Sequence, residues 1–202
     1  GKSEKVLINK IYDAKSSHTI PSGSLPPSSS GHEFNINFWM FINDYIYDYD
    51  IDKIIIDRGN TFIVQLDKET NSLTIKLLTL KRNYTEAHNS LNNIASKSSY
   101  SPVDFVSTTI SPNSEELEVF KVNNIELQKW ININISLVNT SLDIFIDGYL
   151  VKTLLLKGIP INGHYDMNIC PSGGFNGFLN KLTYHNKALS PQEILSIYKT
   201  KP

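Results

Sequence analysis

Two aspartates, Asp143 and Asp147, have the spacing that comes nearest to a catalytic pair. Residues four positions apart in a strand share one face, and two carboxylates about 5 Å apart can hydrolyse a glycosidic bond. Asp147 is followed by Gly148, however, and Asp-Gly between apolar runs is typical of a type I′ turn, where the aspartate has a conformational role. We therefore expect structural roles for both acids, no catalytic residue and no enzyme activity.

The other reactive residue types lack the partners that they would need. The five histidines are His18, His32, His88, His164 and His185. They show no metal-ligand spacing, and the single cysteine, Cys170, cannot form an internal disulfide. No serine lies in a Gly-x-Ser-x-Gly turn, and no glycine-rich loop could hold a phosphate. The sequence therefore predicts no metal site and no cofactor.

Alternating tyrosines and aspartates in residues 44–52 form the first candidate binding site. If this segment is extended, its tyrosines point to one side and Asp48, Asp50 and Asp52 to the other. A tyrosine ring can stack on the apolar face of a pyranose, and carboxylates accept hydrogen bonds from vicinal hydroxyls. The alternative is that the tyrosines pack on the rim of the fold while the acids are merely solvated. With two residues of the next turn, the candidate carbohydrate-binding residues are Tyr45, Tyr47, Asp48, Tyr49, Asp50, Arg58 and Asn60.

A second candidate surface follows from the alternation of residues 34–42 and 130–137. In the first segment, one face is apolar and predicts core positions: Phe34, Ile36, Phe38, Met40 and Ile42. The second segment is expected to be a half-buried antiparallel strand. Their non-core faces, with one residue of a later strand, combine amides and aromatic rings suited to glycans: Asn35, Asn37, Trp39, Phe41, Asn132, Asn134 and Phe145. A long loop or the Ser/Pro-rich segment could instead cover this surface.

Charge and hydropathy exclude two classes of partner. Charged residues make up 19% of the sequence and the formal net charge is −1, so nothing indicates binding to phosphate backbones or anionic lipid. No apolar run approaches the length of a membrane span. We expect neither nucleic-acid binding nor direct membrane insertion.

The remaining elements indicate one all-β domain over residues 1–202. Further strands are expected at residues 6–12, 53–56, 61–66, 72–80, 119–122, 142–146 and 150–156. The Ser/Pro-rich segment 16–31 predicts an ordered crossing, whereas residues 83–112 predict a long loop with a possible short helix over 86–95. Glu115, Glu116 and Glu118 are interpreted as a solvated run. Three N-glycosylation sequons occur, of which Asn83 and Asn139 are plausible acceptors and Asn134 lies within a predicted strand.

The C-terminal segment predicts one well-capped helix. Ser190 is the expected N-cap, Pro191 follows it, and Glu193 completes a capping box. Leu189 and Ile194 have the spacing of a hydrophobic staple. The apolar spacing implies that this helix seals one end of the sandwich.

This helix and the Gly-broken strand before it resemble the end of laminin-G-like domains in the concanavalin A-like lectin and glucanase superfamily. Residues 34–42 resemble the family's Phe-x-Ile-x-x-Trp strand, and residues 127–152 resemble its Trp and Ile-Asp-Gly-x-Leu-Val hairpin. The pattern is most similar to versions encoded by large DNA viruses of algae and protists. It departs from them at residues 45–49, where those versions read Trp-Asn-Tyr-Arg-Tyr.

The resemblance implies a two-sheet antiparallel β-sandwich, a concanavalin A-like jelly roll, with one short C-terminal helix. The glucanase motif Glu-x-Asp-x-x-Glu is missing, and so are the carboxylates of a pentraxin-like calcium site around Asn60 and residues 169–174. The leading hypothesis is thus a non-catalytic lectin-like module that binds carbohydrate through rim loops on a virion or cell surface. The alternative is a structural or protein-interaction domain, whose partner would be a host or virion surface protein.

Overall fold

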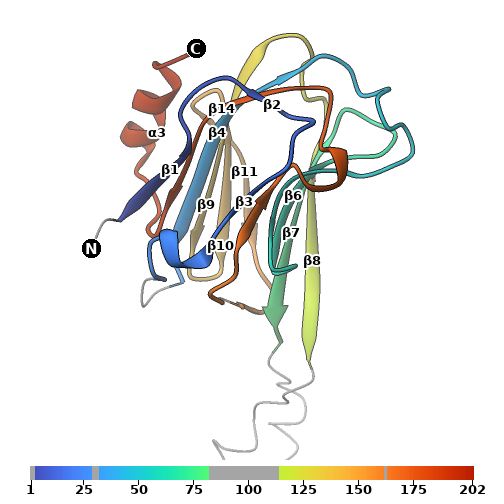
Figure 1. Ribbon diagram of the computed structural model, residues 1–202. Helices are drawn as coiled ribbons and strands as arrows, with labels where there is room; N and C mark the ends of the chain where they lie inside the picture. The colour runs from blue at the N-terminus through green and yellow to red at the C-terminus, as the bar shows by residue number, and fades with distance from the viewer. Residues whose placement is uncertain (1–2, 29–31, 82–113, 162) are drawn as a thin grey trace, which may run out of the picture.

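The structure is a computed structural model that describes residues 3–28, 32–81, 114–161 and 163–202. Two antiparallel sheets pack face to face, and one short helix lies outside them (Figure 1). This confirms the predicted fold class. The sequon at Asn83, the long segment 83–112 and its possible helix lie outside the described residues.

In the described residues each sheet has seven strands. The first sheet has the order β1-β14-β4-β9-β10-β11, with β2 also on β14: β1 Glu4–Ile8, β2 Tyr12–Asp13, β4 Phe34–Ile42, β9 Trp130–Val138, β10 Ser141–Ile146, β11 Tyr149–Leu155 and β14 Gly177–His185. The second has the order β12-β7-β6-β5-β13-β3, with β8 also on β7: β3 His18–Ile20, β5 Lys53–Arg58, β6 Phe62–Leu66, β7 Leu73–Leu80, β8 Glu115–Val122, β12 Ile159–Pro160 and β13 Met167–Ile169. Two short 3-10 helices, η1 Ser22–Ser24 and η2 Pro171–Gly173, lie in the connections.

Strand β4 confirms the alternation expected of residues 34–42. Ile36, Phe38, Met40 and Ile42 are completely or almost completely buried between the sheets, while Phe34 is partly exposed. They meet inward-facing residues of the second sheet such as Ile75. Because burial of apolar area is the main favourable term in folding, this inner layer supplies most of the stability of the sandwich.

The turn and the cap predicted from local sequence are both present. Asp147 and Gly148 have φ angles of 51° and 81°, as a type I′ turn requires, and they join β10 to β11. The helix α3 (Pro191–Tyr198) begins after Ser190, whose side chain accepts from the Glu193 N–H, and the Glu193 side chain accepts from the Ser190 N–H. Leu189 and Ile194 pack in one apolar cluster, as the staple predicts.

The position of α3 differs from the expectation that it seals one end of the sandwich. The helix lies on the outer face of the first sheet (Figure 1). There the Tyr198 ring stacks on Trp39 of β4, with ring centroids 5.9 Å apart, and Ile194 packs with Phe145 of β10. The central strands β4 and β9 are therefore covered on both faces, so β9 is buried on both sides rather than half-buried.

The acidic run at the start of β8 also differs from its prediction. Glu118 is buried, and its carboxylate accepts hydrogen bonds from the Thr79 hydroxyl and from the N–H groups of Lys157 and Gly158. A buried carboxylate is tolerated when it is hydrogen-bonded in this way. Glu118 thus fixes the connection to β12 instead of being solvated. The described part of the Ser/Pro-rich segment contains β3 and η1.

Candidate binding site at the sandwich rim

The Tyr/Asp segment forms a loop of consecutive turns between β4 and β5. Asp48 and Asp50 have φ angles of 47° and 71°, and the N–H groups of Tyr49 and Ile51 donate to carbonyls three residues back. A residue with a φ in this range is not in the extended conformation. The segment is therefore not extended, and its tyrosines and aspartates do not divide between two opposite sides as an alternating strand would place them.

Asp44 organises the beginning of this loop. One carboxylate oxygen accepts from the N–H groups of Ile46 and Tyr47, and the other accepts from the Asn176 side chain at 2.8 Å. The bond from the Tyr47 N–H is the main reason that the pKa of Asp44 is lowered. Because these bonds favour the ionised form, Asp44 is a charged anchor at neutral pH.

Tyr47 ties the loop to two neighbouring segments. Its hydroxyl donates to the carbonyl of Gly173 at 3.1 Å, and the ammonium of Lys15 lies 4.8 Å from the centre of its ring. Burial, with the nearby Asp48 carboxylate second, raises the pKa of Tyr47, so its hydroxyl stays protonated. The N–H of Asp50 donates to Lys68, which joins the loop to the β6–β7 turn as well.

The outer part of the loop is open to solvent. Tyr49 is 56% exposed and Ile46 is 72% exposed. Asp48 and Asp50 are also exposed, while Tyr45 and Tyr47 are partly exposed. The loop thus combines an accessible aromatic ring, carboxylates and a braced backbone, which is an arrangement that can bind a polar ligand with an apolar face.

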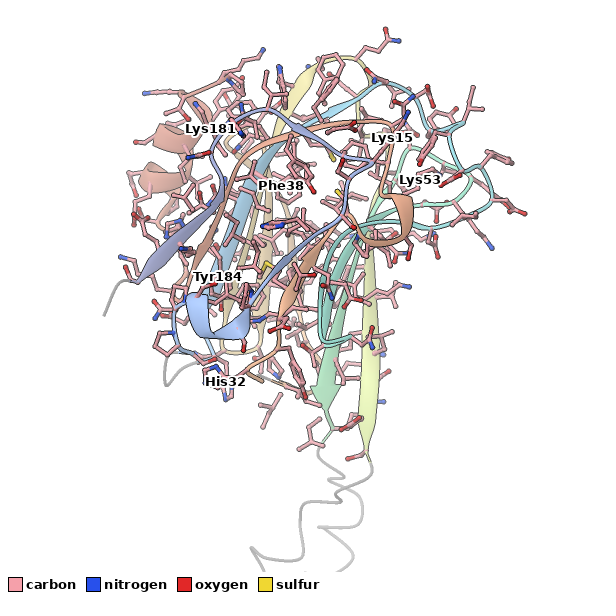
Figure 2. All side chains as sticks on the ribbon, in the orientation of Figure 1. Lys15, His32, Phe38, Lys53, Lys181 and Tyr184 are labelled. Atoms are coloured by element: carbon pink, nitrogen blue, oxygen red, sulfur yellow. The ribbon has the colours of Figure 1, made fainter. Side chains whose placement is uncertain are left out.

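A buried lysine lies at the foot of the loop. Lys53, the first residue of β5, is only 1% exposed, and its ammonium donates to the carbonyl of Ile51 at 3.2 Å. Burial lowers the pKa of Lys53, although the surrounding aspartates oppose this shift, with Asp48 the largest of them. Its positive charge offsets part of the negative charge of the loop. Figure 2 shows Lys15 and Lys53 at the same end of the molecule.

Arg58 and Asn60 do not join the tyrosines and aspartates of the loop. β5 runs from Lys53 to Arg58, so these two candidates lie at its opposite end, about 17 Å away for five steps of an extended strand. Asn60 is exposed in the β5–β6 turn, where its N–H donates to Asp57. Arg58 is buried and its guanidinium donates to Tyr184 and Tyr165.

The second candidate surface is closed by α3. The amide side chains of this face are buried and bonded to one another: Asn35 donates to Asn134 and Ser136, Asn37 donates to Asn35, and Asn134 donates to Asn132. Trp39 and Phe145 are buried with them, and only Phe41 is partly exposed. The cover is the terminal helix, whereas the expected alternatives were a loop or the Ser/Pro-rich segment.

The two aspartates considered for hydrolysis have structural partners. Asp143 accepts from the Thr153 hydroxyl at 2.8 Å, and Asp147 accepts from the Asn132 N–H at 2.9 Å.

Asn139 is exposed in the β9–β10 turn, so its sequon stays a prediction. Within the described ranges no three His, Cys, Asp or Glu side chains gather as a metal site, and no helix there is long and apolar enough to span a membrane.

Sequence reasoning missed several residues that build the rim site. Lys15 and the segment with Gly173 and Asn176 are brought to the loop from distant parts of the chain, and Lys53 directly follows it. No local motif marks any of them. The only available signal was a lysine at the first position of an apolar strand, where a side chain facing the core must find an oxygen partner.

The fold is similar to that of neurotoxin binding domains. No protein-family model and no curated protein matches the sequence. The botulinum neurotoxin serotype G binding domain has a TM-score of 0.57 at 14% identity, covering 98% of this chain and 46% of that chain. The serotype D/C binding domain has a TM-score of 0.54 at 17% identity, covering 83% of this chain and 36% of that chain.

A third solved structure is the binding domain of botulinum neurotoxin DC in complex with rat synaptotagmin II. Its TM-score is 0.51 at 17% identity, covering 83% of this chain and 35% of that chain. This chain therefore spans less than half the length of these solved chains. At such low identity the likeness concerns the fold, and it fits the lectin-like sandwich expected from the sequence.

Proposed function

We propose that this chain is a non-catalytic binding module that recognises carbohydrate through the loop of residues 44–52. The observation that carries the proposal is the exposed Tyr49 ring beside the exposed carboxylates of Asp48 and Asp50, on a loop braced from three sides. Tyr45 and Tyr47 complete the site. Asn60 and Arg58 lie at the other end of β5, where Asn60 is exposed and Arg58 is buried.

The exposed groups of the loop are complementary to those of a sugar. A pyranose ring has an apolar face that stacks on an aromatic ring, and its hydroxyls donate to carboxylates. A braced loop loses little conformational entropy on binding, which favours affinity. The solved structures with this fold add support, because they are neurotoxin binding domains. Display on a virion or cell surface is part of the proposal and is based on the sequence resemblance.

The test is a broad glycan array at micromolar protein concentration, with and without calcium, followed by titration of any glycan that binds. Tyr49→Ala should weaken binding about tenfold, the loss expected for one stacked ring. Asp48→Asn should weaken it as well. Tyr149→Ala is the matched control, because Tyr149 is 72% exposed on β11, outside the loop. Uniformly blank arrays would refute the proposal.

A second candidate function is docking of a protein, and a specific surface favours it. β11 is the edge strand of the first sheet, and four of its apolar side chains are exposed: Tyr149, Leu150, Val151 and Leu155. Leu155 is 79% exposed. An exposed apolar edge strand is a known place for another chain to bind. One of the solved neighbours is a binding domain in complex with a protein, rat synaptotagmin II.

Protein docking and glycan binding make opposite predictions for the variants Leu155→Asp and Tyr49→Ala. A protein partner taken from a host or virion surface should lose affinity on Leu155→Asp and keep it on Tyr49→Ala. The glycan proposal predicts the reverse order. Measuring both variants against each ligand class therefore separates the two functions.

A further inference from the structure

Strand β8 is a long, regular edge of the second sheet (Figure 1). It pairs with β7 on one side over Glu115–Val122, and within the described residues no strand pairs with its other side. Its register with β7 has no bulge. Other outer strands are short or irregular, since β3 has three residues and the pairings of β1 and β11 each contain a register shift. Proteins usually blunt a free sheet edge in these ways, and β8 is not blunted.

The backbone groups of the outer edge belong to the odd-numbered residues of β8. The Lys81 N–H donates to the carbonyl of Ser114 at 2.8 Å, and this bond continues the antiparallel ladder with β7. Because hydrogen-bonded pairs alternate along such a ladder, the even-numbered residues of β8 face β7. The N–H and C=O groups of the odd-numbered residues therefore point outward: Glu115, Leu117, Val119 and Lys121. The carbonyl of Lys121 agrees with this direction, since it accepts from the Lys152 ammonium at 3.0 Å.

The side chains of the same four residues are exposed on the outer face of the sheet. Glu115 and Lys121 are exposed, and between them Leu117 is 43% and Val119 is 49% exposed. The order along the strand is thus acid, apolar, apolar, base. In the opposite direction the order is base, apolar, apolar, acid. The edge is therefore complementary in charge to a reversed copy of itself.

We propose that two copies of this chain associate through β8, antiparallel and related by a two-fold axis at residue 118. This register places Glu115 of each copy opposite Lys121 of the other, and Leu117 opposite Val119. Opposite charges and apolar side chains that face each other across two strands stabilise a sheet. All four residues direct their backbone groups outward, so each pair can exchange two backbone hydrogen bonds. The second sheets of the two copies then form one continuous sheet.

The charges select this register over its neighbours. An axis at Leu117 would place Glu115 opposite Val119, and an axis at Val119 would place Lys121 opposite Leu117. Both alternatives keep the backbone bonds but lose the two charge pairs. The copy is also favoured over an unrelated protein strand, because β8 itself carries the complementary pattern. This interface is separate from the loop of residues 44–52 and does not depend on glycan binding.

The present partners of three groups on β8 are compatible with the pairing. Glu118, on the axis, is buried and accepts hydrogen bonds within its own chain, so its charge is stabilised before two copies meet. The Lys121 ammonium lies 3.1 Å from Asp67, but its side chain is 52% exposed and an ammonium has three donors. The Lys121 carbonyl, which accepts from Lys152, has a second lone pair.

Sedimentation velocity of the wild-type protein, from micromolar to submillimolar concentration, tests the association. We expect monomer to convert to dimer as the concentration rises. Val119→Lys should weaken the dimer at least about tenfold, because it places a lysine opposite Leu117 of the other copy. Val119 is half exposed, so this variant should keep the wild-type melting temperature of the monomer. A wild-type monomer over the whole range, or an unchanged dimer in Val119→Lys, would overturn the proposal.

A charge exchange tests the register. Glu115→Lys and Lys121→Glu should each weaken the dimer at least about tenfold, since each places like charges opposite each other. An equimolar mixture of the two variants should form a heterodimer, because every charge pair across the axis is then opposite. Glu4→Lys, the same change on the edge strand β1 of the first sheet, should dimerise like the wild type. Variants that dimerise alone, or a mixture that stays monomeric, would overturn the proposal.

Discussion

Two surfaces of this molecule have similar residue types, but one is open to solvent and the other is covered by a helix. The loop of residues 44–52 presents tyrosines and carboxylates to solvent, whereas the outer face of β4 and β9 presents aromatic rings and amides to the helix α3. Both surfaces have the residue types that bind sugars. The difference shows that residue type alone does not define a site, since a covering element can satisfy the same groups internally.

The covered face is stabilised by packing and by its own hydrogen bonds. Ile194 of α3 is fully buried against the sheet, and the buried asparagines form a chain of amide bonds across β4 and β9. The rim loop is held instead by anchors around Asp44 and Tyr47, and the side chains of Asp48, Tyr49 and Asp50 are exposed to solvent. Changes to the covered face should therefore alter stability, and changes to the outer loop should alter binding.

Ile194→Ala should have the largest effect on stability. It removes a fully buried side chain between α3 and the sheet and should lower the free energy of unfolding by about 2–4 kcal/mol. Urea denaturation measures this difference. Leu195→Ala is the control, because Leu195 is 38% exposed on the same helix and should change little. Loss of ligand binding without loss of stability would mean that α3 belongs to the recognition surface.

Asn134→Ala should have the next largest effect. Asn134 accepts from Asn35 at 3.2 Å and donates to Asn132 at 3.0 Å, so its removal takes one hydrogen bond from each of two buried amides and leaves the Asn132 side-chain oxygen without this donor. The expected cost is about 1–3 kcal/mol. Asn9→Ala, on the exposed surface, is the comparison. Equal melting temperatures for the two variants would show that the amide chain contributes nothing.

Asp67 makes the stability of the rim depend on pH. Burial alone would raise the pKa of its carboxyl, but hydrogen bonds from Lys121, Thr70 and the Glu69 N–H lower it to about 2. Since the unfolded value is about 3.9, this stabilisation is complete above that pH and is lost as the pH falls through about 2. Asp67→Asn should cost up to about 2 kcal/mol at pH 6.

The same variant should approach the wild type as the pH is lowered. Free energies of unfolding measured at pH 6, 4 and 2.5 give the comparison. A difference between Asp67→Asn and wild type that stays constant over this range would contradict the assignment. The ion pair with Lys121, at 3.1 Å, would then contribute no net stability.

Ser190→Ala should have the smallest effect of these changes. It removes the side chain that accepts from the Glu193 N–H at 3.2 Å, and the loss of such a cap costs about 1 kcal/mol. Ser196→Ala, inside the same helix, should leave stability unchanged or slightly higher, because alanine is the better helix former. Glycan binding at the rim should be the same in both variants.

Local sequence was sufficient for most of the strands, the Asp147-Gly148 turn and the capped helix. Each of these is determined by neighbouring residues: alternation in β4, two positive φ values in the turn, and the Ser190–Glu193 box in α3. The place where α3 docks could not be predicted, because it depends on contacts between residues far apart in the chain, Trp39 with Tyr198 and Phe145 with Ile194. The same is true of Glu118, whose carboxylate is satisfied by N–H groups 39 and 40 positions away.

The candidate site was predicted only in part for a related reason. The tyrosines and aspartates of residues 44–52 were evident from composition, but their conformation depends on turns with positive φ at two aspartates. Arg58 was grouped with them because it is close in sequence. Since β5 carries the chain to the far end of the sandwich, that proximity is lost in space.

The stack of Tyr198 on Trp39 gives the protein a built-in optical reporter. Trp39 is shielded from water beneath α3, whereas Trp130, the second tryptophan, is partly exposed. In a Trp130→Phe background the remaining indole should emit at short wavelength while the helix is docked. Its emission should move to longer wavelength when the helix separates, so a fluorimeter could follow α3 independently of the sheets.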